Sequence, residues 1–305
     1  MKFDSMFDLM ETFPNEESCV RHLEELRWPT GVVCPLCGES RKIYRLTRGF
    51  LFKCSDCKGQ FSVRKGTIFE ESRLPLRKWF AAAWLITSNR KGIASTQLAR
   101  EIGVTQKTAW FMLGRLREVA IAIGDMGGPI HGVVEADETY MGGKEKNKHA
   151  SKREHAGRGA VGKQPVIGVV EREGRVKTQL IESPSANEVH QFIKSNVMPG
   201  STLYTDDHRS YLGLTDYQHA SVNHSAGQYV MGDCYTNGIE SFWALLKRGH
   251  YGIFHNMSRK HLHRYLAEFE TRWGMAEAEL GGRARMDAML ESASGLRLTY
   301  KGLIA

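Results

Sequence analysis

The sequence predicts a multidomain α/β protein, and three features of the chain support that fold class. Two Cys-x2-Cys pairs stand in a strand-like stretch over residues 31 to about 66, and helical periodicity follows from Leu76 to about Ile123. Strand and helix patterns then alternate up to Trp273. Because a domain averages roughly 150 residues, the 305 residues fit two domains, or three if one is small.

Turn-forming residues divide the chain into five expected segments. The stretch GDMGGP at 124–129 is rich in glycine, contains a proline and is the clearest domain boundary. We expect an N-terminal helical cap, a small ribbon, a three-helix region, a mixed-sheet domain and a C-terminal helical tail, at residues 1–30, 31–68, 69–126, 127–275 and 276–305.

Composition excludes several classes of protein. Hydrophobic residues at 41% and charged residues at 25% are ordinary globular values, which argue against disordered, collagen-like and disulfide-scaffold chains. The longest apolar run, Phe80 to Ile86, is far shorter than the roughly 20 residues of a membrane span, and the N-terminal sequence lacks a signal-peptide pattern. We therefore expect a cytoplasmic protein with no membrane partner.

The charge balance favours a polyanionic partner. Lysine and arginine number 42 against 34 acidic residues, which gives a formal net charge of +8. The isoelectric point is about 9.2. Such a balance is typical of nucleic-acid-binding proteins, although merely basic proteins share it.

The first 68 residues predict a short helix followed by a ribbon. Val20, Leu23, Leu26 and Trp28 recur near helical spacing before Pro29 ends the pattern. The stretch GFLFKCSDCKGQFSVRKGT then alternates apolar and polar positions, as strands do. A module this small needs a staple in order to fold.

Four of the six cysteines supply that staple. Cys34, Cys37, Cys54 and Cys57 follow the spacing Cys-x2-Cys-x16-Cys-x2-Cys, which presents four thiolates to one tetrahedral zinc ion. Because four thiolates leave no open coordination position, we expect a structural zinc and chemistry elsewhere. Buried reduced cysteines and a redox pair are the alternatives. Basic side chains around the knuckles fit either a ribbon that lies on phosphates or a solvated face of a protein-docking module: Arg41, Lys42, Arg45, Arg48, Lys53, Lys58, Arg64 and Lys65.

Residues 76 to about 123 predict three helices, and the last two fit a helix-turn-helix. Ala99 would face the companion helix, Gly103 would supply the turn, and Trp110, Leu113 and Leu116 would point inward. Four residues that open the second helix are candidates for contact with base edges: Thr105, Gln106, Lys107 and Thr108. Two arginines further along the same helix, Arg115 and Arg117, are candidates for contact with phosphate. An ordinary helical linker bundle is the alternative.

Beyond residue 129 the patterns predict one mixed-sheet domain. Strand candidates occur at 131–140, 164–173, 175–183, 201–208 and near 219–223. A helical pattern at 186–198 precedes the fourth strand, and a long helical region extends from Asn237 to Trp273. This order of elements is typical of a mixed α/β sheet.

Three carboxylates stand where strands end or where a helix begins in this domain. Asp137 and Asp206 end apolar strands, and Glu240 opens the helical segment TNGIESFWALLKRG. Carboxylates that border one cleft repel one another unless a cation lies between them. Oxygen ligands suit Mg²⁺ or Mn²⁺, and two such ions would support phosphodiester displacement. Three further acids compete for these positions: Glu135, Glu138 and Asp207.

The helix that begins near Glu240 also carries a basic residue suited to phosphate. Lys247 lies two helical turns after Glu240, so the two side chains share one face of the helix and the lysine can reach a phosphate there. The buried stripe of the same helix is expected to comprise Ile239, Phe242, Trp243 and Leu246.

Five segments resemble, in order, the bacterial insertion-sequence DDE transposases that carry an N-terminal zinc ribbon, the ISXO-two-like group. They are CPLCG with KCSDCKGQFSVRKGTIFE, ADETYMGGKEKNKH, LYTDDHRSYLGL, VNHSAGQYV and TNGIESFWALLKRGHYGIFHNMSRKHLHRYL. The resemblance covers nearly the whole chain. It implies an RNase H-like, retroviral-integrase-like catalytic domain, Mg²⁺- or Mn²⁺-dependent hydrolysis at element ends, and strand transfer by the exposed 3′-hydroxyl.

The resemblance also implies roles for particular residues. Asp137 matches the first acid of the family, Asp206 the second and Glu240 the third, and Lys247 matches the lysine seven residues beyond. Some relatives use an asparagine in the third position, which Asn237 matches. The implied roles are metal binding for the three acids and positioning of the DNA end for the lysine.

The expected function is that of a DNA transposase. Its ribbon and helix-turn-helix would recognise terminal inverted repeats, and its catalytic domain would cut and join DNA. The expected partners are double-stranded DNA, as inverted repeats and as target, and further copies of the chain, because two element ends must meet; bound to DNA, the protein would lie at the nucleoid. The alternatives are a domesticated or inactive zinc-ribbon regulator and a structure-specific nuclease that cuts DNA without joining it.

Overall fold

The computed structural model divides the chain into two compact units. It describes residues 5–143, 149, 151, 153, 162–172, 174–222 and 235–305. Unit 1 comprises Met1–Asn89, Ile93–Ile123 and Leu280–Ala305, and unit 2 comprises Arg90–Gly92 and Gly124–Glu279. Within the described ranges, no helix is long and apolar enough to cross a membrane.

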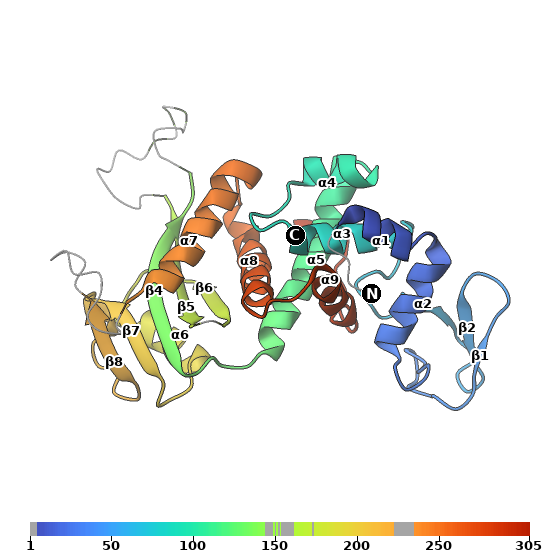
Figure 1. Ribbon diagram of the computed structural model, residues 1–305, viewed down its shortest axis with the longest axis horizontal. Helices are drawn as coiled ribbons and strands as arrows, with labels where there is room; N and C mark the ends of the chain where they lie inside the picture. The colour runs from blue at the N-terminus through green and yellow to red at the C-terminus, as the bar shows by residue number, and fades with distance from the viewer. Residues whose placement is uncertain are drawn as a thin grey trace. The chain divides into compact units, whose positions relative to one another are not determined.

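Two short helices and a small sheet begin unit 1 (Figure 1). The helices are α1 (Met6–Thr12) and α2 (Glu16–Arg27), and each starts at a capping box. The antiparallel sheet has the order β1-β2-β3, with β1 (Ile43–Arg45), β2 (Leu51–Cys54) and β3 (Gln60–Ser62). The helix over α2 and the strand-like ribbon agree with the sequence analysis, which did not expect α1.

The ribbon packs on a small aromatic core. Phe52 and Phe61 stack with their ring centroids 5.6 Å apart, and Trp28 at the end of α2 lies edge-on to Phe52. Cys34 and Cys54 are buried beside these rings. Because this core is small, a staple must contribute much of the stability of the ribbon.

Helices complete unit 1, including two from the end of the chain. They are α3 (Leu76–Ser88), α4 (Ser95–Ile102), the part of α5 (Gln106–Met126) up to Ile123, α9 (Gly282–Glu291) and α10 (Tyr300–Ile304). The three helices predicted between Leu76 and about Ile123 are therefore present. Helix α9 packs along α3, and an isolated bridge joins Thr67 to Ser294, so the C-terminal segment belongs to the core of this unit.

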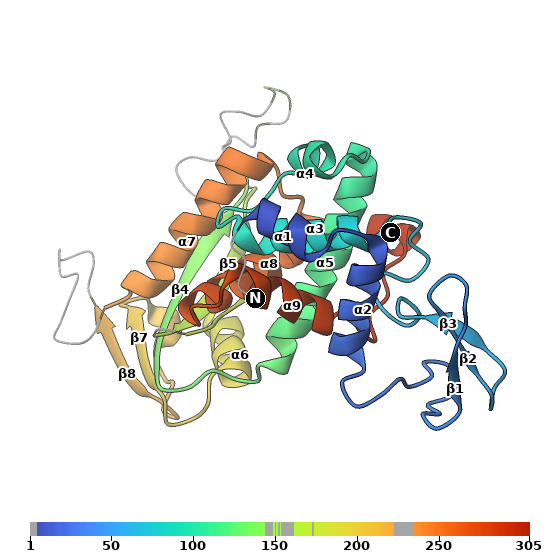
Figure 2. The ribbon, with the colours of Figure 1, turned by 45° about the vertical axis from the view of Figure 1, so that its right-hand side comes forward.

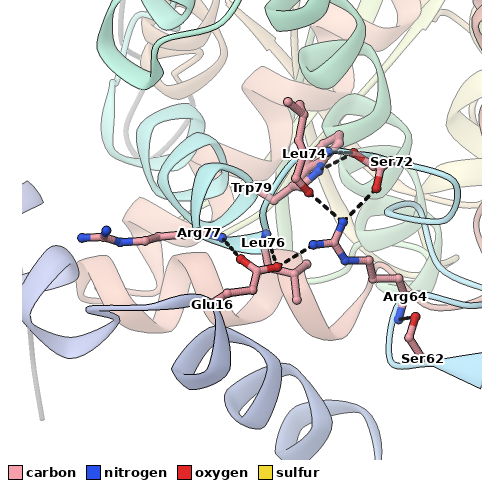
Figure 3. A network of polar contacts seen from close by, with 8 residues as sticks. All are labelled: Glu16, Ser62, Arg64, Ser72, Leu74, Leu76, Arg77 and Trp79. Carbon is pink, nitrogen blue, oxygen red and sulfur yellow. Dashed lines mark hydrogen bonds and ion pairs between the residues drawn. The ribbon is translucent and has the colours of Figure 1, made fainter. Parts of the chain in front are cut away.

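A mostly buried ion pair connects the ribbon with α2 and α3 (Figure 3). One carboxylate oxygen of Glu16 accepts hydrogen bonds from Arg64 Nη2 at 2.6 Å and from the backbone N–H of Leu76 at 2.8 Å. Arg64 Nη1 donates to the carbonyl oxygens of Ser72 and Leu74 at 2.9 and 2.7 Å. Glu16 thereby caps α3, whose own N-cap residue makes no side-chain hydrogen bond.

Replacement of Arg64 by alanine should lower the free energy of unfolding by about 1–3 kcal/mol, because it removes the counter-ion of Glu16 and the donor to the carbonyl groups of Ser72 and Leu74. The measurement is urea unfolding of the zinc-loaded protein. Arg21→Ala is the matched control, since its pair with Glu17 is exposed and is worth about 0.5 kcal/mol or less. Equal losses in the two variants would contradict the structural role of Arg64.

Unit 2 is built on a five-stranded mixed sheet with the order β6-β5-β4-β7-β8 (Figure 1). The strands are β4 (Val133–Met141), β5 (Gln164–Glu171), β6 (Val176–Leu180), β7 (Thr202–Asp206) and β8 (Gln218–Val222). Strands β4, β5 and β6 are antiparallel to their neighbours in that group, whereas β4 pairs with β7, and β7 with β8, in parallel. The five strands and their mixed pairing match the sequence prediction.

Helices cover both faces of this sheet (Figure 1). Helix α6 (Ala186–Asn196) contributes Val189 and Phe192 to the core on one face, together with Val134 and Ala136 of β4. Helices α7 (Asn237–Gly249) and α8 (Leu262–Glu277) form the core on the other face, which includes Met141 of β4. The predicted stripe on α7 is confirmed, since all its members are buried: Ile239, Phe242, Trp243 and Leu246.

The long helical region predicted from Asn237 to Trp273 is interrupted. After α7 the chain forms a π-helical turn at His250–Phe254, and His255 then takes a φ of +58° that ends the helical path. A short 3₁₀ turn at Arg259–His261 leads into α8. The apolar pattern continues across the break because both helices pack on the same face of the sheet.

Candidate catalytic and metal sites

Four cysteines of the ribbon form a compact sulfur cluster. The Sγ atoms of Cys34 and Cys57 lie 3.8 Å apart, those of Cys37 and Cys54 lie 3.7 Å apart, and all four lie within 4.8 Å of one another. Zinc–sulfur bonds of about 2.3 Å in a tetrahedron put the sulfur atoms about 3.8 Å apart. The distances and the donor chemistry therefore fit a structural zinc ion.

Backbone geometry at the two knuckles explains why the thiolates converge. The N–H of Cys34 donates to the carbonyl of Glu39, and the N–H of Cys54 donates to the carbonyl of Gly59. The residues that follow Cys37 and Cys57, Gly38 and Lys58, both have positive φ, as these tight turns require. At Gly59 a Cβ atom would lie 2.4 Å from the end of the Leu36 side chain and 3.3 Å from Cys57 Sγ, so a larger residue would have to displace Leu36 and crowd a zinc ligand.

Some of the basic residues near the ribbon have partners within unit 1. Arg45 pairs with Glu24 and lies over the ring of Phe52, and Lys65 pairs with Glu70. Arg64 is used in the network described above. The other five of the group are exposed, and two of them also make contacts within the ribbon, Lys58 with the carbonyl oxygen of Ser55 and Arg41 with Glu39: Arg41, Lys42, Arg48, Lys53 and Lys58.

The three acids predicted from the sequence approach one another in unit 2. Asp137 lies in β4 opposite Gly168 of β5, with its side chain on the face covered by α7. Glu135 pairs with Tyr204 in the parallel register of β4 and β7, so the same register carries Asp206, at the end of β7, beside Asp137.

Charge interactions show that Glu240 reaches the same place from α7. Burial, together with the charges of Asp206 and Glu240, raises the pKa of Asp137 to about 6. Glu240 is exposed in the first turn of α7, where its carboxylate accepts a hydrogen bond from Thr236 Oγ1 at 3.1 Å. The charges of Asp206 and Glu240 thus act on Asp137, whereas among the described residues only the four cysteines lie close enough together to hold a metal ion in this arrangement.

The competing acids occupy different environments. Glu138 points to the α6 face, where burial and the charges of Asp137 and Asp206 raise its pKa to about 7, beside the buried ring of Tyr211. Asp207 is exposed. Glu135 is buried and uses both carboxylate oxygens in hydrogen bonds to the protein.

Trp243 of α7 closes the site on the side of β5. Its indole lies over Gly168, where a Cβ atom would come within 2.7 Å of the ring. Lys247 lies one further turn along α7 and is half-buried. Asn237, the alternative third ligand, is exposed at the first residue of α7.

The raised pKa of Asp137 predicts a pH-dependent stability. The native carboxyl binds a proton that the unfolded chain releases above its ordinary pKa of 3.8, so stability falls as pH rises from about 4 towards 6. Asp137→Asn removes this loss. The free energy of unfolding of the variant should be higher than that of the wild type by about 3 kcal/mol at pH 7, because a shift of about two pKa units is worth about 1.4 kcal/mol per unit. Near pH 4 the difference should be small.

Urea unfolding of the zinc-loaded protein without added Mg²⁺, repeated from pH 4 to pH 8, measures this difference. Asp207→Asn is the control, since Asp207 is exposed. A constant difference between Asp137→Asn and wild type at every pH would mean that Asp137 is not desolvated.

The predicted helix-turn-helix residues separate into exposed and buried groups. Helix α4 is followed along the chain by α5 (Figure 2). Helix α4 ends at Gly103, which takes a φ of +62°, and Thr105 Oγ1 accepts a hydrogen bond from the backbone N–H of Thr108 at the start of α5. Thr105, Gln106 and Lys107 are exposed and Thr108 is half-buried. Gln106 donates to Ser95 Oγ at 2.9 Å, which ties α5 to the start of α4.

The two arginines of α5 require a correction. Arg115 is buried and donates to the carbonyl oxygens of Ile68, Glu70 and Leu298, so its guanidinium holds the interior of unit 1 together and is not available to a phosphate. Arg117 is also buried, with 3% of its surface exposed. The sequence analysis assigned both arginines to phosphate contacts, because the spacing of residues in a sequence does not reveal that the C-terminal segment packs on α5 at Arg115.

A four-cysteine ribbon that precedes a mixed-sheet domain with clustered acids is the domain combination of a transposase, and comparison with known families agrees. Residues 14–60 match the transposase zinc-ribbon domain, and residues 129–274 match the ISXO2-like transposase domain. The chain belongs to the ISXO2-like family of insertion-sequence transposases.

Two relatives and one solved structure are similar to the chain. An uncharacterized protein in transposable element ISH50 of Halobacterium salinarum is 30% identical over 304 residues, which cover 93% of this chain and 99% of the relative. An uncharacterized transposase-like protein of Haemophilus influenzae is 32% identical over 105 residues, 34% of this chain and 84% of that protein. The match to a chain of the Mos1 strand transfer complex spans 66% of this chain and 77% of the Mos1 chain, at 13% sequence identity. Its TM-score of 0.21 is too low to support any inference about this chain.

Proposed function

We propose that this transposase binds the terminal inverted repeats of its element and carries out Mg²⁺- or Mn²⁺-dependent phosphodiester hydrolysis followed by 3′-hydroxyl strand transfer. The observation that supports this most is the electrostatic coupling of Asp137 with Asp206 and Glu240. The mixed sheet, with β4 central and flanked by antiparallel β5 and parallel β7, supports an RNase H-like catalytic domain.

The chemistry of the three acids fits divalent metal ions. Oxygen-only donors suit Mg²⁺ or Mn²⁺, and the burial and mutual repulsion that raise the pKa of Asp137 are relieved by a cation. Two such ions, when bound, activate the attacking oxygen and stabilise the leaving oxygen. Asp137 and Asp206 hold the metal in this proposal, Glu240 contributes from α7, and Lys247 on the same helix face binds the phosphate of the DNA end.

Glu240 is the better third ligand of the two residues considered. Its charge acts on the pKa of Asp137, and a carboxylate is a stronger ligand for a divalent ion such as Mg²⁺ than the neutral amide of Asn237. The same coupling argues against a regulator without catalysis, since a chain that only binds DNA has no use for three repelling carboxylates. The other alternative, a nuclease that cuts DNA without joining it, is distinguished from a transposase by the absence of joined products.

Unit 1 is proposed to recognise the inverted repeats. The exposed start of α5, with Thr105, Gln106 and Lys107, fits entry into a major groove, while Arg115 and Arg117 are withdrawn from the proposed contacts. Gln106→Ala should lower the preference for the specific end sequence, and Lys107→Ala should weaken both specific and non-specific binding. Footprints at two salt concentrations measure both effects, and unchanged footprints for both variants would remove α5 from the interface.

The test of the whole function is an assay with the flanking DNA ends of the element and a plasmid target in Mg²⁺. Wild type is compared with Asp206→Ala, and Asp207→Ala is the matched control from the next position, which is exposed. We expect joined products from wild type and Asp207→Ala only. Cut but unjoined ends would favour the nuclease, and binding without products from any variant would favour the regulator.

Because two element ends must meet, joining should also require an oligomer of the protein, which sedimentation of the protein–DNA complex measures.

A further inference from the structure

A buried glutamate on β4 holds the N-terminus of α7. Glu135 is 1% exposed, and its Oε2 atom accepts hydrogen bonds from the backbone N–H groups of Gly238 and Ile239 at 2.7 and 3.1 Å. These donors are among those that a helix leaves without an internal partner. A negative charge at this end of the helix is also favoured by the helix dipole.

The second carboxylate oxygen of Glu135 is bound by an arginine. Arg172, after β5, donates from Nε to Glu135 Oε1 at 3.3 Å. Its guanidinium lies 3.7 Å from the ring centroid of Tyr235 and 4.9 Å from that of Tyr204. Arg172 thus contacts two aromatic rings while it pairs with Glu135, so the buried carboxylate has a counter-ion that the rings help to hold in place.

The chain leaves no room for another side chain in this contact. A Cβ atom at Gly238 would lie 2.8 Å from Glu135 Oε2 and 3.1 Å from the side chain of Val170. The close approach of helix and carboxylate therefore depends on glycine at this position. A cavity of about 200 Å³ borders the contact, lined among others by Arg172, Tyr235 and Trp273.

Glu135 and the first catalytic acid stand on the same face of the same strand. Asp137 is two residues after Glu135, and side chains two apart in a strand point in the same direction. Glu240 lies in the turn of α7 that Glu135 holds, two residues after Gly238 and one after Ile239. One strand therefore carries both an acid of the cluster and the anchor for the helix that supplies another.

We infer that Glu135 is a positioning residue that fixes the first turn of α7, and with it the carboxylate of Glu240, against Asp137. The inference rests on the proposed metal-dependent function and adds a residue that acts through the helix. Both oxygens of Glu135 are hydrogen-bonded to protein groups, so the inference gives Glu135 no direct contact with the metal. The interaction consists of hydrogen bonds to an acceptor, so an amide in the same place can replace part of it.

Two substitutions of Glu135 separate positioning from other roles. Glu135→Gln keeps an oxygen acceptor for the N–H groups of α7, whereas Glu135→Ala removes it. Loss of a partner that orients a metal ligand costs about 10- to 100-fold in metal affinity. We expect Glu135→Ala to raise the Mn²⁺ concentration for half-saturation by about that factor, and Glu135→Gln to raise it far less.

Half-saturation is measured by Mn²⁺ electron paramagnetic resonance on the full-length zinc-loaded protein, well below the unfolding temperature of each variant, and by the Mn²⁺ dependence of end cleavage. Gly238→Ala should reproduce the effect of Glu135→Ala from the helix side, because its methyl group displaces the same contact. Glu171→Gln is the matched control, since Glu171 borders the same cavity and pairs with Arg175 and His131 rather than with α7.

A double variant tests whether Glu135 acts through Glu240. Glu135→Ala combined with Glu240→Gln should bind Mn²⁺ no more weakly than Glu240→Gln alone. Equal impairment by Glu135→Gln and Glu135→Ala would indicate direct metal binding and overturn the inference. Loss of thermal stability in Glu135→Ala with unchanged half-saturation would overturn it as well, in favour of a purely structural role. If Asp137→Ala also keeps metal-dependent cleavage, the proposed function itself fails.

Discussion

Replacement of Asp137 by alanine should abolish strand cleavage and strand transfer while specific binding of the element ends stays nearly intact. Asp137 is the central member of the acid cluster, since the charges of both Asp206 and Glu240 act on its pKa. Loss of a residue that only orients a metal ligand costs about 10- to 100-fold, so loss of the ligand itself should cost more. Binding should persist because the proposed DNA-reading residues belong to unit 1 and Asp137 to unit 2.

Cleavage and joining of labelled element ends in Mg²⁺, together with a binding titration, measure the two effects separately. Asp207→Ala serves as the control, because Asp207 is an exposed acid of the same domain. Cleavage that persists in Asp137→Ala would remove Asp137 from the site. Loss of binding together with cleavage would mean that the substitution disturbs the fold, and Asp137→Asn would then decide between the two explanations, since it keeps the size of the side chain.

The sequence predicted most elements of the two units because their signals are local. The strands of unit 2 are marked by apolar runs, and α7 by the periodic stripe that includes Phe242 and Trp243. The zinc ligands follow from spacing alone, since two knuckles impose their own geometry. The break after α7 escaped prediction because His255, a residue without a strong preference for positive φ, ends the helical path.

What the sequence could not predict depends on contacts between distant residues. Arg115 looked like a phosphate ligand, but its partners are carbonyl groups of Ile68, Glu70 and Leu298. Glu135 looked like a competitor of Asp137, but α7 and Arg172 occupy its oxygens. In both cases the polar side chain is the same in either role, and only the tertiary partner decides between an interior contact and a functional one.

Replacement of Cys54 by serine should unfold the ribbon and remove specific binding of the element ends. Cys54 is fully buried, and its Sγ atom lies 3.7 Å from that of Cys37 in the cluster of four thiolates. Structural zinc contributes about 10–16 kcal/mol to the folding of such modules, far more than the small core around Phe52 and Phe61 can replace. The zinc content should fall from one ion per chain to nearly none.

Cys19→Ala separates this effect from the general loss of a buried thiol. Cys19 is buried in α2 outside the cluster of four thiolates, so its replacement removes a buried thiol without removing a zinc ligand. Zinc content by mass spectrometry, protease resistance of the ribbon and footprints on the element ends are compared in the two variants. The control should keep its zinc and its footprint. A normal footprint in Cys54→Ser would show that the ribbon is not used to recognise the ends, while retained zinc would show that three thiolates are enough to hold it.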